Sequence, residues 1–150
     1  MLAAVLAIFG LTATPAFAQS GHFVGTPTCR DAGVTVECTG KVAGLGGTTF
    51  TITVEAAGIA TVECTNPGGN VAPGQDTEVD VSGSSGPLAT PRNGQFRFNL
   101  ESDDPNPLPA TPTCPNAQWT PTITDVTFGD ATVTLREDGA VSDTITVPVT

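Results

Sequence analysis

Apolar and polar residues alternate along most of the chain, and this period of two predicts β-strands. Val34–Cys38 and Phe50–Val54 show it clearly, because every second residue is apolar and the residues between them are Thr or Glu. The dominant Thr and Val side chains are β-branched and fit a pleated, half-buried surface. The same alternation predicts further strands within residues 60–64, 78–81, 96–100, 121–128, 132–136 and 145–149.

Turn-forming residues separate these stretches at intervals of about ten residues. We expect turns at residues 44–47, 57–58, 66–74, 83–87, 92–94, 129–130 and 138–139. Outside the N-terminal segment we find no helical stripe, and 17 Gly and 13 Pro disfavour long helices. The pattern therefore predicts an all-β fold, an immunoglobulin-like β-sandwich of about 7–9 antiparallel strands.

One strand shows a break in its alternation. In the sequence TPTITDVTF, Ile123 cannot share one face of a regular strand with Val126 and Phe128. An extra residue near Thr124-Asp125 would return all three to the core side. We therefore expect a β-bulge there.

The first 18 residues have the features of a secretory signal. An apolar run from Leu2 to Leu11 is followed by Pro15 and by the small residues of Ala16-Phe17-Ala18, which predict cleavage before Gln19. The apolar run is too short to cross a bilayer, which takes about 20 residues. We expect a signal peptide at residues 1–18, then one secreted β-sandwich domain at residues 19–150 without membrane insertion.

Four cysteines in an exported chain predict two disulfides, for which three pairings exist. Cys29 and Cys38 flank residues that favour a turn, so two short strands could bring them face to face. That pairing leaves Cys64 with Cys114. A metal site of cysteines is disfavoured, because the chain has no CxxC pair and a single His.

The chain is acidic, with 15 Asp and Glu against 5 Lys and Arg and a formal net charge of −10. Nucleic acid and anionic lipid surfaces would repel it, so we exclude both as partners. Asp76, Glu78 and Asp80 share one face of an expected strand, where like charges can protect a sheet edge from aggregation. The alternative is a site for a cation or a cationic partner, and we favour protection of the edge.

The sequence contains few of the residues and motifs that enzymes use for catalysis. The chain has no Tyr, one His, one Lys and neither a GxSxG nor an HExxH motif. We therefore expect that the protein is not an enzyme and needs no cofactor. A calcium ion is the one metal that we consider, because hard oxygen ligands gather in an expected loop at Glu101, Asp103, Asp104 and Asn106.

Trp119 is the only tryptophan, and it follows Cys114 by five residues. An exposed Trp can stack on a sugar or anchor a partner protein. A Trp close to a disulfide can equally pack into the core beside that bridge, which is the interpretation that we favour.

Four segments resemble a group of small secreted bacterial proteins, common in actinomycetes, that have no assigned activity. The resemblance covers about residues 29–149, and its most specific parts are the sequence CTNPGGN from Cys64 and the sequence CPN from Cys114 with Trp119. The segments are CTGKVAGLGGTTFTITVEAAG, ATVECTNPGGNVAPG, RNGQFRFNL and CPNAQWTPTITDVTFGDATVTL. The resemblance implies a bacterial extracellular origin and an immunoglobulin-like sandwich, and it supplies no catalytic residues.

These observations favour a non-enzymatic extracellular domain that is structural or adhesive, with a cell-surface or extracellular protein as its partner. Its contacts would come from the loops Asn66–Gly74 and Asp103–Pro115, because rigid sandwiches commonly present loops for binding. The alternative is a ligand-binding module for calcium or carbohydrate. The sequence leaves self-association open.

Overall fold

The computed structural model describes residues 20–150, which form ten β-strands and no helix. The expected signal peptide lies outside these residues. No helix within them is long and apolar enough to cross a membrane. The strands are β1 (His22–Phe23), β2 (Thr28–Asp31), β3 (Val36–Ala43), β4 (Thr49–Thr65), β5 (Val71–Pro73), β6 (Thr77–Ser84), β7 (Leu88–Ala89), β8 (Phe96–Glu101), β9 (Thr120–Glu137) and β10 (Ala140–Pro148).

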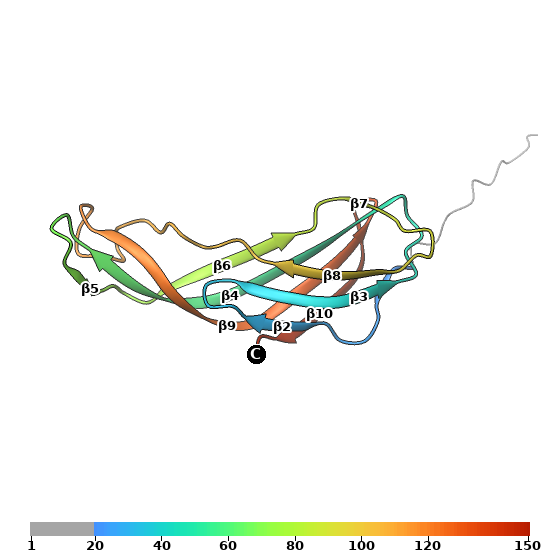
Figure 1. Cartoon of the computed structure of the whole chain (residues 1–150), viewed down its shortest axis with the longest axis horizontal. Coiled ribbons are helices and arrows are strands. Elements are labelled where there is room, and N and C mark those ends of the chain that lie inside the picture. Colours follow the sequence, from blue (N-terminus) through green and yellow to red (C-terminus); the bar gives the residue numbers. More distant parts are fainter. Residues whose placement is uncertain (1–19) are drawn as a thin grey trace, which may run out of the picture.

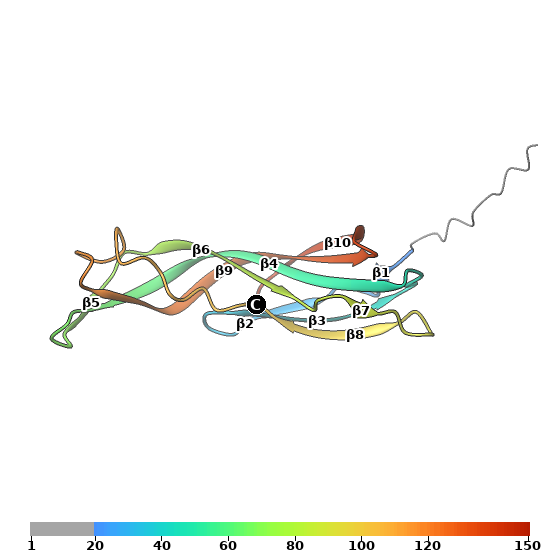
Figure 2. The ribbon, with the colours of Figure 1, turned by 90° about the horizontal axis from the view of Figure 1, so that it is seen from above.

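The strands form two antiparallel sheets that face each other over part of the molecule (Figure 2). In sheet A, β3 pairs with β1 and β2 on one side and with β8 on the other. In sheet B, the order is β10-β9-β4, and β5, β6 and β7 all pair with β4. The all-β antiparallel architecture expected from the alternation is confirmed.

Two very long strands give the molecule its elongated shape (Figure 1). β4 has 17 residues and β9 has 18, and they pair along almost their whole length. Strands of this length span about 55 Å, much more than the strands of sheet A. Sheet B therefore continues beyond the end of sheet A.

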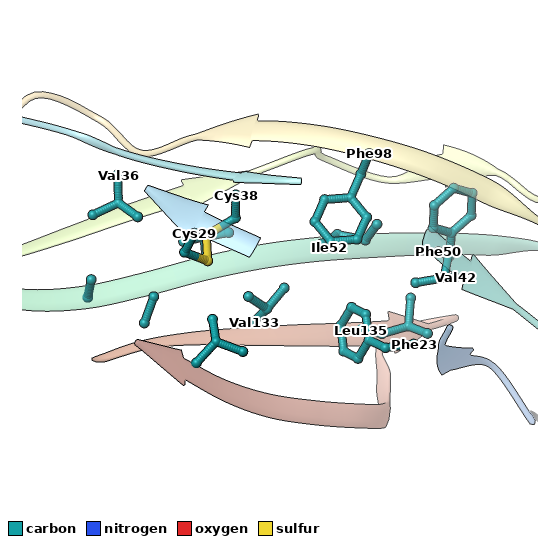
Figure 3. Packing of buried hydrophobic residues seen from close by; sticks show 14 of the residues in the cluster. Phe23, Cys29, Val36, Cys38, Val42, Phe50, Ile52, Phe98, Val133 and Leu135 are labelled. Carbon is teal, nitrogen blue, oxygen red and sulfur yellow. A yellow bond between two sulfur atoms is a disulfide. The ribbon is translucent and has the colours of Figure 1, made fainter. Parts of the chain in front are cut away.

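This difference in length divides the molecule into two regions. The proximal region, residues 20–56, 81–101 and 131–150, contains both sheets around a core of 16 buried residues. Figure 3 shows Phe98 of sheet A above Ile52 and Leu135 of sheet B, with the Cys29–Cys38 disulfide beside them. Phe50 and Phe96 also meet across the layers, with their ring centroids 5.1 Å apart.

The distal region, residues 57–80 and 102–130, has one sheet and a smaller core. Its buried residues are Ala60, Val62, Val79, Ile123 and Val126. Leu108 from the long loop between β8 and β9 and Val34 from the β2–β3 turn pack against them. A loop and a turn thus cover the inner face of sheet B where the second sheet ends.

Both disulfides have the pairing expected from the sequence. Cys29 and Cys38 are direct partners across β2 and β3, with their Cα atoms 4.1 Å apart. Cys64, near the end of β4, is joined to Cys114 in the long loop. The second bridge fixes that loop to the distal region.

The predicted bulge is confirmed, but two predicted turns are wrong. β9 has an extra residue at Thr124, because Asp125 pairs with Thr61 and Ile123 with Val62. Residues 57–58 and 129–130, which we expected to be turns, lie inside β4 and β9. Gly58 serves close packing instead, since a Cβ there would lie 2.6 Å from Val126 Cγ1. Four expected strands therefore merge into two.

Candidate functional site

The outer face of sheet B is hollowed where the proximal and distal regions meet. Two adjoining hollows, of about 520 and 490 Å³, share Ala57 and Asp80. Glu55, Asp80 and Asp130 line the first, and Glu78 and the 45%-exposed Ile59 line the second. We call this continuous surface the acidic groove.

Small residues and a second bulge shape the acidic groove. Ala57, Gly58 and Gly129 have little or no side chain, so the sheet surface is recessed there relative to the longer side chains around it. The β4–β9 register shifts between Ala56 and Gly58, which leaves Gly129 and Asp130 opposite Ala57 alone. A bulge of this kind can change the direction of a side chain, here Asp130.

One wall of the acidic groove is the edge strand β6. β6 pairs with β4 and with no second strand among residues 20–150. Asp76, Glu78 and Asp80 are all exposed along this edge. Glu78 and Asp80 share one face of β6, as the sequence analysis predicted, and both line the acidic groove, whereas Asp76 lies just before the strand begins.

The distal region next to the acidic groove carries only negative charge. Its two segments contain eight Asp and Glu and no Lys, Arg or His. Glu55 and Asp130 form no ion pair within the described part of the chain. A ligand in the acidic groove would therefore meet a field that favours cations.

The two loops that we expected to make contacts lie together at the distal end. The Gln75 amide donates a hydrogen bond of 3.0 Å to the Thr113 carbonyl, and Pro73 and Pro115 line one shallow hollow. Trp119 lies at the C-terminal end of the longer loop, half-buried and outside both buried clusters. Trp119 is therefore part of neither buried cluster, and a stacking role for Trp119 stays a prediction.

The four residues considered as calcium ligands do not all converge on one point. Glu101 accepts a hydrogen bond of 2.7 Å from Thr35 Oγ1, while Asp104 accepts one of 2.8 Å from the Asn106 amide. Asn106 Oδ1 accepts a hydrogen bond from the Ile123 amide, and the Asp103 amide donates to Ser82. Across residues 20–150, no three His, Cys, Asp or Glu side chains are grouped so as to hold a metal ion.

Sequence analysis missed the buried carboxylate of Glu137. Its side chain is fully buried and accepts hydrogen bonds from the amides of Gly21, Gly46 and Gly47 and from Ser142 Oγ, at 2.7–3.1 Å. Burial raises its pKa, but these four hydrogen bonds outweigh burial and hold the pKa below its usual value. Glu137 thereby ties the N-terminal segment and the β3–β4 loop to the β9–β10 hairpin.

The sequence contains a signal that could have revealed Glu137. Residues 133, 135 and 137 share one face of the strand, and Val133 and Leu135 are core residues. A carboxylate in phase with core residues must find donors inside the protein. Because its three amide donors, Gly21, Gly46 and Gly47, come from distant segments, the sequence could not have named them.

Comparisons with known proteins do not assign the chain to a group. No protein family and no curated protein matches its sequence. The structure is similar to part of the crystal structure of DesR, a beta-glucosidase from Streptomyces venezuelae in complex with D-glucose, at 14% identity and a TM-score of 0.34. The match covers 87% of this chain but spans only 15% of that chain, and at this similarity it supports no functional argument.

Proposed function

We propose that this protein is a non-enzymatic extracellular interaction domain that binds a basic segment of a partner protein in the acidic groove. The observation that carries the proposal is the groove itself, with the carboxylates of Glu55, Glu78, Asp80 and Asp130 around a low floor. Two disulfides are consistent with an extracellular location, which the sequence of residues 1–18 also favours.

The shape of the groove favours an extended occupant. The groove follows β4 between β6 and β9. It is elongated because the two hollows adjoin along the strand. Ile59 adds apolar surface beside the carboxylates, which suits the aliphatic stem of a Lys or Arg side chain. We therefore expect a peptide segment with several cationic side chains to bind more tightly than a single small amine.

Calorimetric titration with an octapeptide of alternating Lys and Thr tests the proposal. We expect saturable one-to-one binding that weakens with added salt, because charged groups form most of the contact. A variant with Glu55→Gln, Asp80→Asn and Asp130→Asn should lose at least about ten-fold in affinity, equivalent to about 1.4 kcal/mol.

The matched control removes the same number of charges outside the groove, by Glu63→Gln, Asp103→Asn and Asp104→Asn. It should keep affinity within about two-fold, since these exposed carboxylates do not line the groove. An equal loss in both variants would mean that net charge alone attracts the peptide. That result, or no binding to the unaltered chain, would overturn the proposal.

A further inference from the structure

The outer face of sheet A carries two positive charges side by side. Lys41 of β3 and Arg97 of β8 are direct Cα partners in the antiparallel register. Their neighbours Val42 and Phe98 are buried in the core, so Lys41 and Arg97 are on the outer face. Like charges directly opposite each other destabilise a sheet. This arrangement therefore needs a compensating reason.

No carboxylate of the described chain forms an ion pair with either of these two charges. Within residues 20–150 the single ion pair joins Arg30 to Glu37. Glu37 pairs across the sheet with Glu101, and each lies four residues along its strand from the cationic pair. Four residues of strand span about 13 Å, which exceeds the Debye length of about 8 Å at physiological ionic strength.

Both of these carboxylates also have other partners. Arg30 and Asn99 form side-chain hydrogen bonds with Glu37, and the bond from Arg30 contributes most to lowering the pKa of Glu37. Glu101 accepts the hydrogen bond from Thr35 Oγ1. The negative charge on this face is thus held at one end of sheet A, away from Lys41 and Arg97.

A hollow of about 360 Å³ lies on this face at the cationic pair. Three threonines, Thr26, Thr28 and Thr39, line it together with Lys41 and Arg97. Thr28 and Thr39 are direct partners across β2 and β3. The hollow therefore combines a guanidinium from β8, an ammonium group and a hydroxyl from β3, and two hydroxyls from residues 26–28.

Protection of a sheet edge does not account for this pair. β8 is an edge strand among the described residues, so a cation at Arg97 could serve to prevent pairing with another chain. Lys41 is on β3, which has strands on both sides. An explanation for the positions of both Lys41 and Arg97 must therefore involve the outer face of sheet A.

We infer that Lys41 and Arg97, with the three threonines, form a binding site for one phosphate or sulfate group. Arg presents a planar fork of N–H donors and Lys a compact point charge, and both are common ligands of such oxyanions. The hydroxyls add donors from other directions, which suits a tetrahedral group better than a planar carboxylate. The net charge of −10 favours a single group over a polyanion.

The site lies on sheet A, whereas the acidic groove lies on the outer face of sheet B. Its ligand is an anion, and the proposed partner of the groove is a cation. The inference is therefore independent of the proposed function, and either can fail without the other.

Chemical-shift mapping tests the site. The full coding sequence is expressed, and the protein is purified after the host has processed it. The ¹⁵N-labelled protein is titrated with potassium phosphate against potassium chloride at constant ionic strength. We expect saturable shifts at the amides of Thr28, Thr39, Lys41 and Arg97 with phosphate alone. A parallel titration with methyl phosphate separates a site for a monoester, which would bind equally well, from a site for the free anion.

Two double variants with equal charge complete the experiment. Lys41→Gln with Arg97→Gln should weaken phosphate binding by at least about ten-fold. Arg92→Gln with Arg136→Gln, which also removes two positive charges, should leave it within about two-fold. The first variant should melt no lower than the unaltered chain, because it removes a like-charge repulsion.

Several results would overturn the inference. Chloride could produce the same shifts as phosphate, or the two double variants could lose affinity equally. Phosphate shifts spread over the whole surface would also contradict a defined site. If the Lys41→Gln and Arg97→Gln variant fails to fold, the shift map of the unaltered chain decides the question by itself.

Discussion

The proximal and distal regions share the strands β4 and β9 but are stabilised in different ways. In the proximal region two sheets pack around 16 buried core residues. In the distal region a loop covers five buried residues of one sheet. All five Lys and Arg are in the proximal region, whereas the distal region has eight carboxylates and no cation. One pair of strands can thus support a conventional sandwich at one end and an acidic surface at the other.

The comparison shows what replaces a second sheet. Sheet A ends near the β2–β3 turn, and beyond it the long loop with Leu108 packs on the inner face of sheet B. A loop has no ladder of hydrogen bonds to hold its position. The Cys64–Cys114 disulfide and the hydrogen bond from Gln75 to Thr113 supply that attachment. We therefore expect the distal region to depend on its cross-link more than the proximal region does.

We expect the largest change in the free energy of unfolding when either disulfide is removed, each in a separate variant. Cys64→Ala with Cys114→Ala opens a loop with a sequence separation of 50 and should lower the free energy of unfolding by about 4 kcal/mol. Cys29→Ala with Cys38→Ala, with a separation of 9, should cost about 2.7 kcal/mol. Urea denaturation of both variants measures the difference.

Hydrogen exchange locates the effect of each removal. Loss of the Cys64–Cys114 bridge should speed exchange in β5 and the distal part of β9, while amides in β3 keep their protection. A larger loss of stability on removing Cys29–Cys38 would reverse the comparison between the regions.

Glu137→Gln should have the next largest effect, about 3 kcal/mol of destabilisation, because the new amide faces donors that need an acceptor. Glu63→Gln changes an exposed carboxylate and should alter stability by less than about 0.5 kcal/mol. Urea denaturation at pH 7 compares the two. Equal effects would show that the buried carboxylate has no special role in the proximal region.

The pH dependence gives a second test of Glu137. The pKa of its folded state is lower than the ordinary value of 4.5. The ionised side chain therefore contributes stability above about pH 4.5, and this contribution is lost as the pH falls through the folded pKa. In Glu137→Gln the decline in stability below pH 4.5 should be shallower than in the unaltered chain.

Calcium should give the smallest effect. Although the distal region is rich in carboxylates, Glu101, Asp103 and Asp104 do not form a metal-binding group. We expect the thermal midpoint to be the same in EDTA and in millimolar Ca²⁺. A rise of several degrees, as expected for saturation with a specific ligand, would instead make the distal loop a metal site.

The sequence predicts the local structure of this protein better than its long-range structure. Alternation identifies the core residues of β4 and β9, and the parity of Ile123 against Val126 locates the bulge at Thr124. Both signals come from nearest neighbours in the chain. The pairing of Cys29 with Cys38 follows for the same reason, because a short turn joins their strands.

The acidic groove could not be predicted from the sequence, because its parts come from three strands whose register is set at a distance. Gly58 looks like a turn residue, yet its role is to let Phe128 and Val126 approach β4. Asp80 and Asp130 are separated by 50 positions and become neighbours only through β4. Strand pairing, which local pattern does not encode, decides which carboxylates share a surface.

The unbroken passage of β4 and β9 through both regions has a mechanical consequence. A load applied at the distal end of the molecule reaches the C-terminus, which bonds to Cys29 in the proximal region, by way of β9 and β10. The load runs parallel to the strands, so the hydrogen bonds of the β9–β10 ladder resist it together in shear instead of opening one after another. A pull on the distal end along β9 thus meets hydrogen bonds that must break together.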